Sequence, residues 1–245
     1  MKNPATWRPS KYVFKNGKLS ASNDTNELGI ASRMAATIAA EYYQNNIEIY
    51  AKGALLDLGC GKSPLYEIYS KHILSSTSAD WDGTPHKNDN IDVKCDLTKK
   101  LPFDDATYDT VILSDVLEHL PNPENLFSEI YRILKIDGTL LLNTPFLYGI
   151  HEVPHDYYRY TQFALNRFAN ISKFKIVKIE ATGGSPEIFI DLFAKHLQYI
   201  PFVGKISAIF IQRFLLAFRK TKIGKTISQK TAERFPFGYF MVIQK

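Results

Sequence analysis

The chain has 245 residues, of which 45% are hydrophobic and 22% are charged, and its net charge is +5. This length suits one α/β domain, and the apolar content excludes a disordered chain. The sequence lacks the roughly 18 continuous apolar residues of a spanning helix and the apolar core of a signal peptide, and Cys60 and Cys95 have no zinc-ligand or disulfide pattern. We therefore expect a cytoplasmic protein without a metal site.

The first 50 residues are predicted to form a hairpin and a helix. An Asn16-Gly17 dipeptide between short apolar runs favours a tight hairpin turn over residues 12–19. Residues 28–45 carry apolar side chains at helical spacing, and the two asparagines at 45 and 46 are predicted to end that helix.

From residue 51 to 181, strand patterns alternate with helical ones. Strands are predicted over 54–58, 76–80, 91–95, 108–114, 139–143 and 174–180, with a helix after Pro64 and an amphipathic helix over 122–135 that Asp137-Gly138 closes. Such alternation predicts a doubly wound, mostly parallel sheet. A last strand is predicted over 238–243, within residues 236–245.

Residues 182–235 separate the last two predicted strands and are too long for a hairpin connection, so we expect a helical insertion. Residues 192–232 contain no Asp or Glu but eight basic side chains: Lys195, Lys205, Arg213, Arg219, Lys220, Lys222, Lys225 and Lys230. Residues 206–218 are strongly apolar. Three interpretations stay open, which are a lid over the active site, a contact with an anionic membrane surface and an oligomer interface. A phosphate-bearing substrate would also be attracted to residues 195–230.

The turn after the first strand of the sheet, in the stretch LLDLGCGKSP over residues 55–64, admits three ligands. A P-loop needs a glycine five positions before Gly61, where Leu56 stands. A dinucleotide turn needs a third glycine for close helix packing, where Pro64 stands. Asp57-x-Gly59-x-Gly61 instead resembles the first motif of the class I S-adenosylmethionine-dependent methyltransferases, and two glycines let a ligand approach the backbone.

Later residues extend this resemblance over roughly residues 50 to 145. Asp80 ends the second strand, where the resemblance implies bonds to the ribose hydroxyls, and Asp96-Leu97 resembles the position that binds the adenine amino group. The stretches 101–109, 111–119 and 132–138 resemble the family's sequences around its fourth strand and before its fifth strand. The cofactor-binding residues implied are Asp57, Gly59, Cys60, Gly61, Asp80, Trp81, Asp96, Leu97 and Ser114. The alternatives are that Asp80 caps a helix, that Trp81 only packs beside a strand end and that Asp96 belongs to a turn. Glu118 and His119 are more typical of structural than of catalytic residues.

Residues 144–161 follow the predicted fifth strand, at the sheet edge where ligands of open α/β sheets bind. His151-Glu152-x-x-His155 matches a zinc-protease helix, but Pro154 opposes a regular helix, so we reject that interpretation. The stretch instead offers groups that bind and deprotonate an acceptor. His155 is the first candidate for a general base, with His151 and Asp156 next, and the candidate acceptor-binding residues are His119, Glu152, Tyr158 and Arg159.

The sequence therefore predicts a single methyltransferase domain over 1–245, with a cofactor-binding core over 51–181. The fold implied is a Rossmann-like, mostly parallel seven-stranded sheet with an antiparallel last strand and a helical insertion before it. The expected activity is methyl transfer from S-adenosylmethionine to a small-molecule, sugar or glycan hydroxyl. A loose resemblance to methyltransferases of surface-polysaccharide pathways suggests the glycan. The alternatives are a lipid or isoprenoid-quinone methyltransferase at the inner membrane face and a silent partner subunit. No nucleic-acid partner is expected, because Ser114-Asp115-Val116-Leu117 replaces the motif of amino-methylating enzymes.

Overall fold

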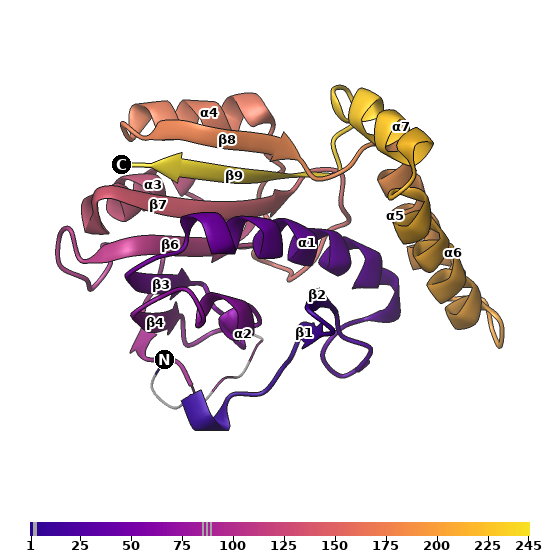
Figure 1. The fold of residues 1–245 in the computed structure, drawn as a ribbon, viewed down its shortest axis with the longest axis horizontal. Helices are drawn as coiled ribbons and strands as arrows, with labels where there is room; N and C mark the ends of the chain where they lie inside the picture. Colours follow the sequence, from indigo (N-terminus) through magenta and orange to yellow (C-terminus); the bar gives the residue numbers. More distant parts are fainter. Residues whose placement is uncertain (2–3, 85, 87, 89) are drawn as a thin grey trace.

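The computed structural model describes residues 1, 4–84, 86, 88 and 90–245, and its centre is a seven-stranded sheet of order β5-β4-β3-β6-β7-β9-β8 (Figure 1). The strands are β3 (Ala54–Leu58), β4 (Ser75–Asp80), β5 (Val93–Lys94), β6 (Tyr108–Ser114), β7 (Leu134–Pro145), β8 (Lys175–Ala181) and β9 (Gly238–Gln244). Neighbours from β5 to β7 are parallel, whereas β9 is antiparallel to both β7 and β8. The predicted doubly wound sheet with an antiparallel last strand is confirmed.

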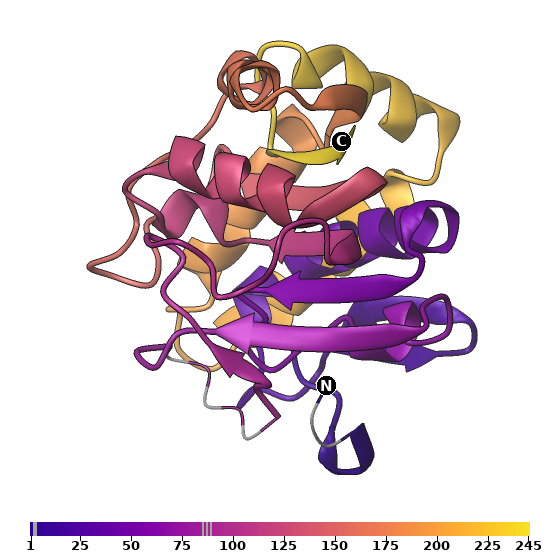
Figure 2. The same cartoon turned by 90° about the vertical axis from the view of Figure 1, so that its left-hand side faces the viewer.

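Helices cover both faces of this sheet (Figures 1 and 2). One layer contains α1 (Arg33–Tyr50) and α2 (Tyr66–Tyr69), and the other contains α3 (Pro123–Ile133) and α4 (Gln162–Ile171). Side chains alternate between the layers along each central strand, as the two-residue period of a strand requires. Leu56 and Leu58 of β3 belong to the core cluster of α3 and α4, whereas Leu55 packs with α1 and α2.

Helix α1 differs from its prediction at both ends. It begins at Arg33 and continues to Tyr50, past the asparagine pair that was predicted to end it. The side-chain amide of Asn46 (Nδ2) donates a hydrogen bond to the backbone carbonyl of Tyr42 one turn earlier, and Ile47 is buried. Tertiary packing of this turn therefore outweighs the weak helix preference of asparagine.

The prediction that Asp137-Gly138 closes a helix was wrong. Helix α3 ends at Ile133, and β7 begins at the next residue, so the dipeptide lies inside a twelve-residue strand. The pairing of β7 with β6 shifts there, and Asp137 has a φ of 62°. Because Asp137 tolerates this left-handed conformation, the dipeptide forms a bulge that leaves β7 paired on both sides of it.

Two smaller units flank the carboxyl ends of the parallel strands (Figure 1). The predicted hairpin comprises β1 (Tyr12–Lys15) and β2 (Lys18–Ala21), and a short 3-10 helix, η2 (Ile30–Ser32), leads into α1. The insertion before β9 consists of α5 (Ser185–Leu197), α6 (Gly204–Phe218) and α7 (Lys222–Ala232), with α5 packed on both other helices. None of the helices described is long and apolar enough to cross a membrane.

Candidate active site

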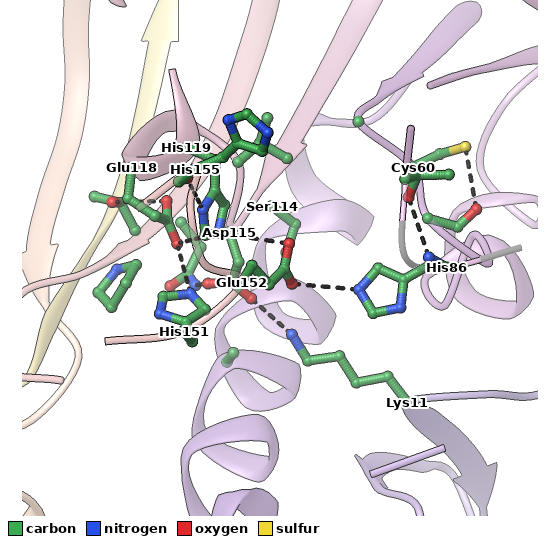
Figure 3. Close-up of a pocket in the computed structure, with 18 of the residues that line it drawn as sticks. Lys11, Cys60, His86, Ser114, Asp115, Glu118, His119, His151, Glu152 and His155 are labelled. Carbon is green, nitrogen blue, oxygen red and sulfur yellow. Dashed lines mark hydrogen bonds and ion pairs between the residues drawn. The ribbon is translucent and has the colours of Figure 1, made fainter. Parts of the chain in front are cut away.

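A cavity of about 930 Å³ lies at the carboxyl ends of β3, β4, β6 and β7. This volume lies near the top of the usual range for small-molecule sites, roughly 300–1,000 Å³. One end is formed by the turn after β3, and the other by histidines and carboxylates from the loops after β6 and β7 (Figure 3). The cavity therefore brings the predicted cofactor residues together with four of the predicted acceptor-side residues, which are His119, His151, Glu152 and His155.

The turn after β3 depends on glycine. The amides of Gly59 and Cys60 both donate to the Ala79 carbonyl of β4, which turns the chain sharply at the end of the strand. Gly59 has a φ of 70°, and a Cβ added there would lie 2.6 Å from Val116 Cγ2. A side chain at this position would therefore be strained and would also collide with the segment after β6.

Asp80 ends β4 and holds this turn in place. Its Oδ2 accepts a hydrogen bond of 2.7 Å from the Gly61 amide, and its Oδ1 accepts one of 2.8 Å from the Trp81 amide. Burial raises its pKa, although the two amide hydrogen bonds act in the opposite direction. Asp80 also lines the cavity, and a carboxylate has about four acceptor sites, so the residue that shapes the turn can also accept from a ligand hydroxyl.

Asp57 is a buried acid near the end of β3. It is 4% exposed, and the hydroxyl of Tyr69 donates to its Oδ2 over 3.2 Å. Burial raises the pKa of Asp57 to about 7. Among the residues that the structure describes, no basic side chain forms an ion pair with it. A ligand that brings an ammonium group to the cavity would meet this need.

The remaining predicted cofactor residues also line the cavity: Cys60, Trp81, Asp96, Leu97 and Ser114. Burial raises the pKa of the Cys60 thiol, which therefore stays protonated and unreactive. Oδ1 of Asp96 accepts from the amide and hydroxyl of Thr98, so this side chain also stabilises its own turn.

The loops after β6 and β7 form a cluster of buried acceptor and donor groups at the opposite end. Glu118 is fully buried, and its Oε1 lies 3.9 Å from His119 Nε2 and 3.8 Å from His151 Nε2. Burial raises the pKa of Glu118, against the influence of His151. Burial alone would lower the pKa of His151, but the Glu118 carboxylate outweighs it and the pKa is raised.

Residues 151–155 form no helix, which confirms that the zinc-protease pattern is only a match of letters. His155 is exposed on the cavity wall, with its Nδ1 at 3.3 Å from the Tyr157 hydroxyl and its ring 5.5 Å from that of Trp81. Glu152 also lines the cavity, where its Oε1 lies 3.3 Å from His86 Nε2 (Figure 3).

Three predicted site residues, Asp156, Tyr158 and Arg159, are not among the described residues that line the cavity. Both oxygens of Asp156 accept from the Arg159 guanidinium at 2.6 and 2.8 Å, which lowers the pKa of Asp156 to about 2. Arg159 also donates to the carbonyls of Tyr148 and Gly149, and Tyr158 donates to the Pro121 carbonyl. These contacts fold the loop, so the three side chains support its shape rather than face a ligand.

The cavity also contains residues that the sequence did not suggest. Lys11 Nζ lies 2.8 Å from Asp115 Oδ2, and the Asn143 amide donates to the other oxygen of Asp115 (Figure 3). Asp115 has a φ of 53°, an uncommon conformation outside glycine. Lys11 and Asp115 are 104 residues apart, and no motif connects them, so only the fold reveals this pair.

Comparison with known proteins gives consistent findings. Residues 56–142 match the family model described as "Methyltransferase domain". The chain is 36% identical over 93 residues to cycloartenol-C-24-methyltransferase 1 of Oryza sativa, a match covering 33% of this chain and 27% of that protein. It is 25% identical over 116 residues to the ubiquinone biosynthesis O-methyltransferase of Coxiella burnetii, covering 44% of this chain and 49% of that protein. The matches thus span between about a quarter and a half of these relatives.

The fold also resembles that of solved structures. A SAM-dependent methyltransferase from Archaeoglobus fulgidus superposes with a TM-score of 0.55 at 19% identity. The superposition covers 85% of this chain and 93% of that one, so the likeness extends well beyond the segment matched by the family model.

Proposed function

We propose that this protein, which contains a class I S-adenosylmethionine-dependent methyltransferase domain, transfers the cofactor's methyl group to a hydroxyl group of a small molecule. One observation carries the proposal. A single cavity joins the glycine turn and acids of a cofactor site to a cluster of histidines and carboxylates at its other end.

The residues of the cavity fit this cofactor. Asp57 offers a buried carboxylate to an ammonium group, and Asp80 offers a carboxylate that lines the cavity to ribose hydroxyls. The glycine turn leaves backbone exposed to a ligand, since the nearest atoms to a Cβ at Gly61 belong to His86 at 3.6 Å. When bound, the cofactor supplies a methyl group on a positively charged sulfur, which leaves with the electron pair of the carbon–sulfur bond.

The chain's own residues then have to position the acceptor oxygen and remove its proton. Positioning alone supplies up to ~7–11 kcal/mol in well-oriented reactions. His155 remains the proposed general base, because it lines the cavity and, among the described residues, has no ion pair. Asp156 is a poor candidate, since its low pKa and its pair with Arg159 leave it little affinity for a proton.

Labelled cofactor tests this proposal. We expect the protein to transfer labelled methyl from S-adenosylmethionine to an acceptor in a cell extract, and expect His155→Ala to lower kcat by about 10²–10⁴-fold. His196→Ala, an exposed histidine on α5, is the matched control. Unchanged turnover in His155→Ala would remove the base assignment, and transfer to amines alone would contradict the hydroxyl acceptor.

A second observation favours an acceptor at the membrane surface. Ile206, Phe210 and Phe214 form an exposed stripe along α6, and Phe202 before it is 99% exposed. In the part of the chain that the structure describes, six basic residues between positions 192 and 232 form no ion pair: Lys205, Arg213, Lys220, Lys222, Lys225 and Lys230. Exposed apolar side chains with unpaired positive charge are typical of surfaces that bind anionic lipids.

The position of the insertion helices is relevant to the alternative interpretation, in which the insertion is a lid over the active site. Within the described chain, no residue of α5, α6 or α7 lines the cavity. The insertion instead lies beside it, because Lys195 Nζ is 3.3 Å from the ring centroid of Tyr148, a cavity residue. We therefore propose that the insertion docks on the membrane and presents the cavity to a lipid or a lipid-linked sugar.

Vesicle sedimentation tests this docking. Phosphatidylcholine vesicles containing phosphatidylglycerol are expected to bind the protein, and binding is expected to fall with added salt and in Lys220→Gln/Lys222→Gln/Lys225→Gln. Lys15→Gln/Lys18→Gln/Lys173→Gln removes the same charge outside the insertion and should keep binding. Equal binding by both triple variants, or none at low salt, would contradict docking. Label recovered in the lipid or the glycan fraction would then separate the two acceptor classes.

A further inference from the structure

We propose that Glu118, His119 and His151 bind one divalent transition-metal ion, such as Zn²⁺, at the acceptor end of the cavity. Binding of the ion is independent of the activity proposed above. Its suggested task, holding the acceptor oxygen, rests on that proposed function.

Three potential ligand atoms converge here from two loops. Glu118 Oε1, His119 Nε2 and His151 Nε2 all lie within 4.8 Å of one another (Figure 3). The two distances from Glu118, 3.8 and 3.9 Å, are too long for hydrogen bonds. Zinc bonds of about 2.1 Å would place tetrahedral ligand atoms about 3.4 Å apart, so small side-chain rotations suffice to enclose an ion.

The tautomers of both histidines favour metal binding. His119 Nδ1 lies 2.7 Å from the His155 carbonyl oxygen, and His151 Nδ1 lies 3.2 Å from that of Gly149. A carbonyl oxygen only accepts hydrogen bonds, so each Nδ1 carries a proton, and Nε2 is the atom of each ring that would bind a metal once any proton there is released. Metal-binding histidines are commonly oriented in this way by a second hydrogen bond.

The buried carboxylate gives an independent reason to expect a cation. Glu118 is fully buried, and its Oε1 has no hydrogen-bond partner among the described residues. The Nε2 atom of His119 is also buried without one. Leaving such groups unsatisfied is unfavourable, and an ion between them would satisfy both.

The ligand set suggests the class of metal. Two imidazoles and one carboxylate suit Zn²⁺ and its neighbours, whereas Mg²⁺ and Ca²⁺ prefer oxygen alone. Three protein ligands leave room for a further group, as in catalytic zinc sites. Glu152 Oε2, 3.9 Å from His119 Nε2, lies close enough to move in when no acceptor is bound. An acceptor oxygen in that position would be oriented and made more acidic by the ion.

Equilibrium dialysis of the chelator-treated protein against Zn²⁺ tests the site. We expect one Zn²⁺ per chain, with a loss of at least tenfold in affinity for Glu118→Gln, His119→Gln and His151→Gln. In the Co²⁺-loaded protein, the visible absorption should change when any of these residues is replaced. His155→Gln is the matched control. It should retain the metal, because the ring of His155 is not one of the three proposed metal ligands.

Binding of S-adenosylhomocysteine, measured in parallel, reports on folding and on the cofactor site. If the variants bind it normally but have lost Zn²⁺, the site is supported. Absence of stoichiometric Zn²⁺ in the wild type, or equal loss in His155→Gln, would overturn the proposal. Zn²⁺ binding without S-adenosylhomocysteine binding would instead contradict the proposed function and leave the metal site standing.

Discussion

The carboxyl group of Asp57 lies buried beside the Tyr69 hydroxyl, and burial raises its pKa to about 7 from the usual 3.8. The folded protein therefore binds this proton more tightly than the unfolded chain does. The stability associated with the protonated acid is present below pH 4 and is lost as the pH rises toward 7. A pKa shift of this size means that the charged form of Asp57 destabilises the ligand-free folded protein by at most about 4 kcal/mol.

Asp57→Asn should therefore make the empty protein more stable than the wild type at pH 8, and the gain should shrink toward pH 4. The same change should weaken S-adenosylhomocysteine binding at pH 8 by at least tenfold, because the amide carries no charge for the ligand's ammonium. Thermal unfolding and calorimetric titration measure the two effects. Asp104→Asn, an exposed aspartate, should change neither. A less stable Asp57→Asn protein at pH 8 would contradict this account.

Several site residues could be identified from the sequence because their signals are local. The glycine turn directly follows β3, whereas Asp57 and Asp80 lie within the last two residues of β3 and β4. Parallel strands bring such ends to one edge of the sheet. The Glu118–His119–His151 cluster has no such signal, since its members come from two loops and have no metal-ligand spacing. Only the backbone carbonyls at 149 and 155 fix the tautomers that make it a candidate metal site.

At the scale of elements, Glu187 connects the three helices of the insertion. Its Oε2 accepts from the Gly184 amide at the start of α5 and from the Ser228 hydroxyl of α7, and its Oε1 lies 2.9 Å from Arg219 Nε after α6. The side chain is fully buried. Removing it would leave Arg219 without this partner and the start of α5 without its cap.

Glu187→Ala is expected to destabilise the insertion by about 3–5 kcal/mol, the usual effect of breaking a buried ion pair. Hydrogen exchange should show the loss as faster exchange in α5 and α7, with little change in β3 and β6. Glu48→Ala removes an exposed glutamate from α1 and serves as the control. Slow exchange throughout the insertion of Glu187→Ala would show that the three helices do not depend on this contact.

Element types were easier to predict than element ends. Buried strands such as β3 and β6 matched their predicted ranges closely, because continuous apolar runs between turn residues leave little choice. The end of α1 and the start of β7 were misplaced, since both depend on contacts outside the local sequence. Asn46 is kept helical by its bond to Tyr42, and Asp137 forms a bulge because β7 pairs with strands on both sides.

For the whole molecule, the sheet order matters more than any single motif. The order β5-β4-β3-β6-β7-β9-β8 brings the cofactor turn and the histidine loops to one edge of the sheet, although Gly59 and His151 are far apart in the sequence. The same edge borders the insertion (Figure 1), and the insertion carries exposed apolar side chains such as those of Phe202 and Phe210. The proposed docking of the insertion on a membrane would therefore bring the acceptor end of the cavity close to a lipid substrate.

Calorimetric titration with S-adenosylhomocysteine tests the central claim most directly, because it needs no knowledge of the acceptor. We predict binding of one molecule per chain, lost in Gly59→Ala, whose added Cβ would meet Val116, and retained in Gly29→Ala, where the same methyl group has open space. Absence of binding to the folded wild-type protein, or equal binding by Gly59→Ala, would contradict the assignment of this cavity to the cofactor.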